Sequence, residues 1–287
     1  MIKSIAASLL VAAGCITGGD GTHVDPTQST QTVTKATFVC VGMENSERFG
    51  ECPGCEVDAT KLTNLFKNKY GYSGTTLISS QATKANVVKT LKDAIAKTGE
   101  SDLLLFCYSG HGGQERLYGA EPDGADTPDE FLCLYDTYML DDEIWDLVTA
   151  CRGRVFLYFD ACHSATMYRS ITTDVSARSP DASPFKAEQK MEKTKGFTFR
   201  VRAQAMSADP KAPTLRMMCW SGCKESEYSY GSYAGGYLTR ALMTKWAMGL
   251  TYGEVWNGVS KTVTAAQPEQ HPVCTTVGGG FEGEVFR

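Results

Sequence analysis

The chain has 287 residues, of which 42% are hydrophobic, so it can build one large domain or two small ones around a sizeable core. Its formal net charge is −5, with 28 Lys and Arg residues against 33 Asp and Glu residues. A general nucleic-acid-binding protein presents a basic face, so this balance argues against nucleic acid as a partner. It leaves room for a local site that binds a basic ligand.

Residues 1–15, MIKSIAASLLVAAGC, are predicted to be an export signal. They begin with a short positive start, continue with an apolar run that is too short to span a membrane, and end with small residues directly before Cys15. This order resembles a bacterial lipoprotein processing site. The polar residues 16–35 would then tether an exported protein to a membrane through Cys15. The alternative is an N-terminal helix that is frayed or buried.

Cysteine usage favours the opposite compartment. Eleven cysteines would suit an oxidising compartment only if they paired, and an odd number remains once Cys15 and Cys162 are set aside. Several others lie within apolar runs, where a reduced cysteine behaves as a small hydrophobic residue. These are Cys40, Cys107, Cys133, Cys151 and Cys219. The sequence therefore leaves both an exported lipoprotein and a cytoplasmic protein open.

From residue 36 to the end, the patterns of strands and helices alternate. Strands are predicted at 36–42, 75–79, 103–108, 131–136, 155–160, 216–222 and 271–277, and helices at 57–70, 83–98, 141–151, 234–248 and 252–266. This alternation predicts βαβ units and a mainly parallel sheet in one domain spanning 36–287. Residues 168–214 are polar without a clear period, and we interpret them as an exposed insertion.

Two of the apolar strands end in residues that can do chemistry. The run at 103–108 is followed by Ser109 and His111, and the run at 155–160 ends at Asp160, two residues before Cys162. Open α/β sheets place their ligands at the carboxyl ends of their strands. An imidazole can deprotonate a neighbouring thiol and make it a nucleophile. A thiol–imidazole pair of Cys162 and His111 is therefore the leading hypothesis.

Five motifs together resemble the caspase-like cysteine peptidases, particularly the metacaspases and their bacterial relatives. They are PGCEVDA (53–59), YSGHGGQ (108–114), LDDEI (140–144), FDACHS (159–164) and WSGCKESE (220–227). The resemblance covers residues 36–287. It implies an α/β fold of the caspase-like type, a three-layer α/β/α sandwich whose mostly parallel sheet has about six strands and carries helices on both faces.

The resemblance also implies the roles of the catalytic residues. Cys162 would attack the scissile carbonyl, and His111 would activate the thiol and protonate the leaving amine. The backbone N–H groups of Gly112 and Cys162 would form the oxyanion hole. No cofactor is required for this chemistry. The implied activity is that of a cysteine endopeptidase acting on proteins or peptides, with the protein expected to be a monomer.

In metacaspases an acidic pocket selects Arg or Lys before the cut, and the matching positions here are Asp58, Ser109 and Asp160. Asp160 shares a strand face with Cys162, since the two are two residues apart. Carboxylates favour a basic substrate residue because a guanidinium pairs with them bidentately. The bland alternatives are that Asp58 caps the helix at 57–70 and that Asp160 is an ordinary carboxylate at a strand end.

Calcium is a further implication of the resemblance. Several metacaspases bind it through an acidic cluster, and Asp129, Asp141 and Asp142 lie at similar positions. The sequence departs from the family pattern after the cysteine, where Ala165 replaces a glycine and Arg169 replaces an aspartate. Asp141 and Asp142 are equally well explained as an N-cap and a first-turn charge.

Three other interpretations stay open. Cys52 and Cys55 have the spacing of zinc ligands, but a single such pair is a weak signal. Basic residues between 178 and 202 would be cut by the enzyme itself if it cleaves after Arg or Lys and the segment is exposed. The rival function is a caspase-like module that binds partners without catalysis, and a weaker rival is a Cys–His hydrolase of small amides or esters.

Overall fold

The computed structural model describes residues 33, 35–115, 129–162, 192–195, 215–224 and 227–287. The predicted export signal and tether lie outside the described residues, as does most of the predicted insertion at 168–214. Among the described helices, none is both long and apolar enough to cross a membrane.

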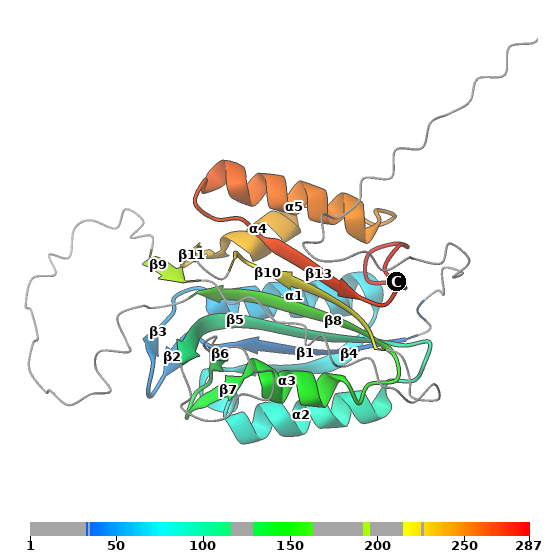
Figure 1. Cartoon of the computed structure of the whole chain (residues 1–287), viewed down its shortest axis with the longest axis horizontal. Coiled ribbons are helices and arrows are strands. Elements are labelled where there is room, and N and C mark those ends of the chain that lie inside the picture. Colours follow the sequence, from blue (N-terminus) through cyan, green and yellow to red (C-terminus); the bar gives the residue numbers. More distant parts are fainter. Residues whose placement is uncertain (1–32, 34, 116–128, 163–191, 196–214, 225–226) are drawn as a thin grey trace, which may run out of the picture.

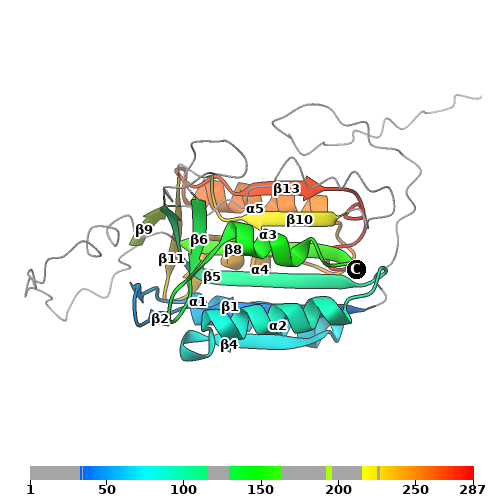
Figure 2. The ribbon, with the colours of Figure 1, turned by 60° about the horizontal axis from the view of Figure 1, so that its bottom comes forward.

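A mainly parallel sheet forms the centre of the molecule (Figures 1 and 2). Along the main path of the sheet, neighbouring strands pair in parallel, except that the last strand of the chain runs antiparallel to its neighbour. Two short strands, described below, branch off this path in antiparallel pairing. In order across the sheet, the strands are β13 (Val273–Val277), β10 (Arg216–Ser221), β8 (Arg154–Cys162), β5 (Leu103–Glu115), β1 (Ala36–Gly42) and β4 (Ser73–Ile78). The predicted parallel sheet is therefore confirmed.

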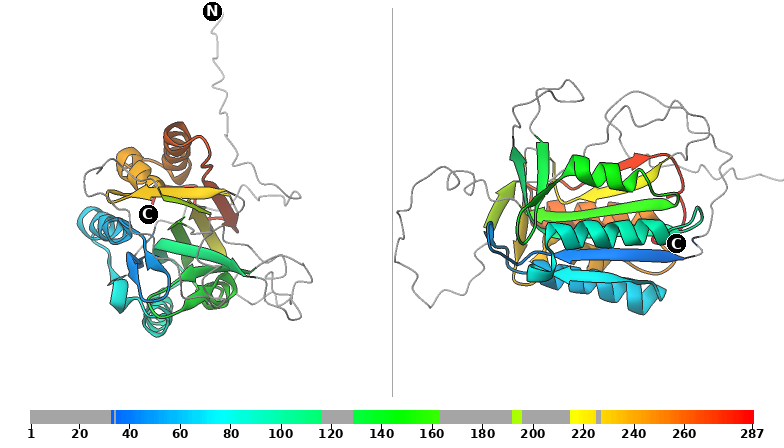
Figure 3. Two further views of the ribbon diagram at one scale, coloured as in Figure 1. Left: turned by 90° about the vertical axis from the view of Figure 1, so that its left-hand side faces the viewer. Right: turned by 90° about the horizontal axis from the view of Figure 1, so that it is seen from below.

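Helices cover both faces of this sheet, which completes the predicted three-layer α/β/α sandwich (Figure 3). One face packs against α2 (Lys84–Lys97) and α3 (Asp141–Val148), and the other against α1 (Cys55–Tyr70), α4 (Tyr237–Lys245) and α5 (Tyr252–Ala266). The sequence of strand β8 has no alternation of apolar and polar residues because both of its faces are covered. Leu157 and Phe159 face the first helical layer, whereas Phe156 and Tyr158 face the second, so both faces of the strand are buried.

The helix ends follow from local chemistry. Thr83 precedes α2, and its side chain accepts a hydrogen bond from the Asn86 N–H. Thr251 precedes α5 and forms a reciprocal capping box with Glu254. Gly71 ends α1 in a left-handed conformation, with φ at 69°, and its N–H donates to the Lys67 carbonyl. The predictions for α1, α2 and α5 lie within two residues of the observed ends, whereas α3 and α4 are shorter than the helices predicted at 141–151 and 234–248.

The short strands agree least with the sequence patterns. Strand β6 (Asp129–Cys133) overlaps the strand predicted at 131–136, but the others were not predicted. These are β2 (Asn45–Ser46), β3 (Gly50–Glu51), β7 (Tyr138–Leu140), β9 (Glu192–Lys195), β11 (Tyr228–Ser232) and β12 (Gly235–Gly236). Strands β12, β11 and β9 form a separate small sheet, so the segment that we interpreted as an exposed insertion contains a strand. Strands of two to five residues carry too short a pattern to show a period, whether they pair in local hairpins, as β2 does with β3, or with a distant segment, as β9 does with β11.

Candidate active site

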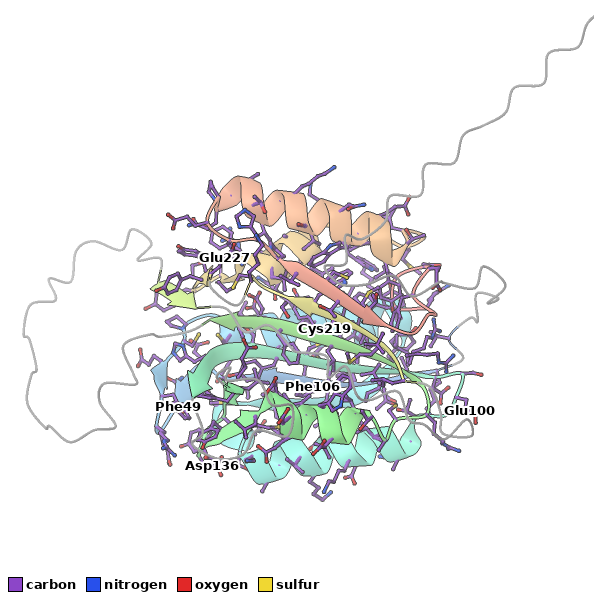
Figure 4. The ribbon with its side chains drawn as sticks, viewed as in Figure 1. Phe49, Glu100, Phe106, Asp136, Cys219 and Glu227 are labelled. Atoms are coloured by element: carbon purple, nitrogen blue, oxygen red, sulfur yellow. The ribbon has the colours of Figure 1, made fainter. Side chains whose placement is uncertain are left out.

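The two chemically interesting strand ends lie next to each other. Strands β5 and β8 pair in parallel up to their carboxyl ends, with Ser109 opposite Asp160 and His111 opposite Cys162. Figure 4 labels Phe49 at this end of the sheet and Glu100 at the opposite end. The structure therefore places the backbone of Cys162 directly beside that of His111, while the Cys162 side chain lies outside the described part.

The imidazole of His111 is buried and oriented by a main-chain carbonyl. Its side chain is 5% exposed, and Nε2 lies 2.9 Å from the carbonyl oxygen of Glu51, at the end of β3. A carbonyl only accepts, so Nε2 carries the proton and Nδ1 is the basic nitrogen. Sequence reasoning missed this partner, because a backbone oxygen supplied by a loop hairpin leaves no residue signature.

The predicted pocket residues come together beside the strand ends that hold the predicted catalytic residues. Ser109 Oγ and the Gly236 N–H both donate to Asp58 Oδ2, each at 2.8 Å. Asp160 Oδ2 accepts from the N–H and the hydroxyl of Thr239, both at 2.7 Å. Asp58 lies within α1, whose N-cap is Gly54, so the alternative that Asp58 caps this helix is wrong.

Both carboxylates are completely buried, and this raises their pKa values. Burial raises the pKa of Asp160 to about 6. Burial first, and then repulsion from Asp160, raises the pKa of Asp58 well above its ordinary value. The ammonium of Lys61 acts in the opposite direction on both groups. Hydrogen bonding by the Ser229 side chain also lowers the pKa of Asp160, while Oδ1 of each carboxylate has no partner with hydrogen-bond geometry in the described chain. Two buried acceptors with unused oxygens suit a cation that carries several N–H donors.

A pair of glycines covers these carboxylates. A Cβ atom added at Gly235 would overlap Asp58 Oδ1, and one at Gly236 would overlap both carboxylate oxygens of Asp160. Gly236 has an ordinary extended backbone, with φ at −69°, so close packing alone excludes a side chain there. Neither glycine nor Thr239 was singled out from the sequence, although the Gly–Gly pair directly before α4 was a usable signal.

We expect Gly236→Ala to lower the free energy of unfolding by about 2 kcal/mol, because the added methyl group must displace a buried carboxylate. Gly253→Ala is the matched control, since a Cβ at Gly253 in α5 meets nothing within 4 Å. This control should leave stability unchanged or slightly raise it. Urea denaturation of both variants measures the difference, and equal stabilities would contradict the close packing over Asp160.

Of the three residues predicted to bind calcium, the side chains of Asp141 and Asp142 are described. Asp141 is the first residue of α3, and the N-cap is Leu140, so the N-cap interpretation of Asp141 is wrong. Asp141 Oδ1 accepts from the Asp142 N–H. Asp129 begins β6, and its side chain lies outside the described part. Among the described side chains, no three His, Cys, Asp or Glu residues could hold a metal ion together. Calcium stays a prediction, and no chemical step depends on it here.

Gly112, the other residue predicted for the oxyanion hole, follows His111 along β5. It pairs with Leu132 of the antiparallel strand β6. This pairing fixes the position of the Gly112 backbone at the carboxyl end of the sheet. Its role in binding an oxyanion stays a prediction.

Comparison with known proteins agrees with the fold and the motifs. The family model of the caspase domain matches residues 36–278. Metacaspase-1 of Pyricularia oryzae is 31% identical over 155 residues, covering 48% of this chain and 39% of that protein. Metacaspase-1A of Aspergillus fumigatus is 26% identical over 251 residues, covering 74% of this chain and 60% of that protein. The chain thus spans less than two thirds of the length of either relative.

Two crystal structures share the fold. A protein of Geobacter sulfurreducens superposes with a TM-score of 0.62 at 21% identity, covering 88% of this chain and 98% of that one. Caspase-1 of Spodoptera frugiperda superposes with a TM-score of 0.56 at 13% identity, covering 88% and 92%. The matched region of the family model runs from β1 to just beyond β13. This protein therefore belongs to the caspase domain family.

Proposed function

We propose that this protein is a cysteine endopeptidase of the metacaspase type that cleaves peptide bonds after Arg or Lys. The observation that carries the proposal is the register of β5 and β8, which sets His111 opposite Cys162 and Ser109 opposite Asp160. The first pair supplies a base and a nucleophile. The second pair, two residues earlier on each strand, supplies the buried carboxylate of Asp160 and the serine that donates a hydrogen bond to Asp58. Catalysis and specificity are thereby built at the ends of the same two strands.

The proposed mechanism uses a thiol–imidazole dyad. His111 Nδ1 accepts the proton of the Cys162 thiol, and the thiolate attacks the scissile carbonyl carbon. The N–H groups of Gly112 and Cys162 stabilise the resulting oxyanion. The protonated imidazole then gives its proton to the leaving amine, and water hydrolyses the thioester with His111 again acting as base. Throughout the cycle, the Glu51 carbonyl keeps Nε2 protonated and the ring oriented.

The specificity follows from the two buried carboxylates. A guanidinium or ammonium would offer N–H donors to the unused Oδ1 atoms of Asp58 and Asp160 and would neutralise their mutual repulsion. Since Gly235 and Gly236 lie over these atoms, binding requires that segment to move aside. A substrate with Asp at this position would bring a third negative charge toward the group and bind poorly.

A panel of fluorogenic peptides tests this function. The peptides differ only at the residue before the cut, which is Arg, Lys, citrulline or Asp, and each is assayed with and without calcium. Cleavage of the Arg and Lys peptides alone supports the proposal, because citrulline keeps the shape of arginine without its charge. Cleavage of the Asp peptide would overturn the specificity. No cleavage of any peptide, even after limited proteolysis of the 168–214 segment, would favour the non-catalytic binding module.

A further inference from the structure

Two cysteines beside the proposed catalytic base touch each other. Cys55 Sγ lies 2.9 Å from Cys52 Sγ, and the two side chains form a small cluster of their own, separate from both cores of the sandwich. The residues are 4% and 3% exposed. Neither residue has a part in the proposed mechanism, and a pair at this spacing supplies too few ligands for a zinc site.

The backbone between these cysteines brings their side chains together. Cys52, Pro53, Gly54 and Cys55 form a turn in which the Cys55 N–H donates to the Cys52 carbonyl at 3.3 Å. Gly54 has φ at 89° and ψ at −3°, the values of the third residue of a type II turn, where proline is common directly before it. The end residues of such a turn have Cα atoms less than about 7 Å apart, which suits a disulfide.

The environment of this pair differs from that of the other buried cysteines. Burial raises the pKa of the thiols of Cys107, Cys133 and Cys219, which lie in strands of the fold. Cys55 is equally buried but is the first residue of the sixteen-residue helix α1, where the positive end of the helix dipole stabilises negative charge on a nearby sulfur. Two thiols in contact, here with Cys55 Sγ donating to Cys52 Sγ, can oxidise to a disulfide once one of them loses its proton and meets an oxidant.

We propose that Cys52 and Cys55 form a reversible disulfide, a redox modification site separate from Cys162. The near-complete burial of both residues favours a small oxidant, hydrogen peroxide. The Cys55 thiolate attacks one peroxide oxygen, the O–O bond breaks, and Cys55 becomes a sulfenic acid as hydroxide leaves. Cys52 then attacks that sulfur, the S–S bond forms, and water leaves. Two electrons pass from the dithiol to the peroxide, and an added dithiol reverses the change.

The disulfide would act on His111 through the next residue along the chain. Glu51 precedes Cys52, and its carbonyl orients the imidazole. Formation of the bond shortens the Sγ–Sγ distance to about 2.05 Å, which draws Cys52 toward α1 and displaces the Glu51 carbonyl. If the protein has the proposed peptidase function, we expect oxidation to lower kcat/KM about tenfold, since small displacements of catalytic groups have effects of at least this size.

Peptide mapping tests the disulfide independently of any activity. Full-length Cys162→Ala protein is treated with hydrogen peroxide, alkylated and digested, so that Cys162 cannot take part. We expect the peptide that holds Cys52 and Cys55 to lose two hydrogens and to regain them with dithiothreitol. In Cys52→Ser, Cys55 should instead be trapped as a sulfenic acid by dimedone. Survival of both thiols, or their separate oxidation to sulfinic acids, would overturn the proposal.

Kinetics on the wild-type catalytic chain then test the link to His111. The wild type and Cys52→Ser are compared before and after peroxide, with Cys274→Ser, on β13 at the far edge of the sheet, as the matched control. Direct oxidation of Cys162 lowers kcat/KM in all three proteins. A further loss of kcat/KM in the wild type and Cys274→Ser, absent from Cys52→Ser and reversed by a dithiol, supports the link. Equal losses in all three would remove it. If reduced protein cleaves nothing, the peptidase function fails, and the mapping still decides the disulfide.

Discussion

Replacing Cys162, His111 or both with alanine should give three proteins with the same residual peptidase activity, on the order of 10⁴-fold below the wild-type kcat/KM. A thiol is a weak nucleophile without its base, and the base has nothing to activate without the thiol. The two groups therefore act as a unit, and their losses are not additive. This is the largest effect that we expect from any substitution in the chain.

The measurement is a double-mutant cycle on the arginine peptide, with circular dichroism to show that each variant folds. The cycle is informative because His111 and Cys162 are opposite each other on β5 and β8. Losses that multiply in the double variant would mean that the two residues act independently. His111→Ala with wild-type activity would assign the base to another residue and contradict the dyad.

Asp160→Asn should lower kcat/KM for Arg and Lys peptides by roughly a hundredfold and at the same time stabilise the protein at pH 7. The activity falls because a buried, hydrogen-bonded charge pair with the substrate is lost. The stability rises because asparagine places a neutral amide where the wild type buries a charged carboxylate. The amide oxygen still accepts the two hydrogen bonds from Thr239. Opposite signs for activity and stability distinguish a functional carboxylate from a structural one.

The pH dependence of stability provides a second test of the same residue. The pKa of Asp160 is raised from 3.8 to about 6 in the folded state, chiefly by burial, so the folded chain holds this proton more tightly than the unfolded chain does. The contribution of Asp160 is therefore fully present below pH 3.8 and is lost as the pH rises through about 6. The loss is on the order of 3 kcal/mol, which Asp160→Asn should abolish.

Urea denaturation at several pH values between 4 and 7 measures this slope for the wild type, Asp160→Asn and the control Asp146→Asn, whose side chain on α3 is exposed. The control should follow the wild type. Asp58→Asn should also reduce the slope, because burial and the charge of Asp160 raise the pKa of Asp58 itself well above its ordinary value. An unchanged slope in both pocket variants would mean that the carboxylates do not titrate as a buried pair.

The sequence by itself determined the layers of this fold and the strand ends at which we propose the active site. The run at 155–160 is apolar without alternation because both of its faces pack against helices, and Thr83, Gly71 and Thr251 mark helix ends through local hydrogen bonds. Signals of this kind need only neighbouring residues. For the same reason, the motifs around His111 and Cys162 are recognisable in the sequence alone.

Only the tertiary structure decided what surrounds those residues. The Glu51 carbonyl reaches His111 from a hairpin whose strands have two residues each, and Thr239 reaches Asp160 from a helix 79 positions further along the chain. Contacts of this kind leave no periodic pattern in the sequence. They depend on main-chain carbonyls, on glycines that allow close packing, and on residues that are distant in the chain but close in space.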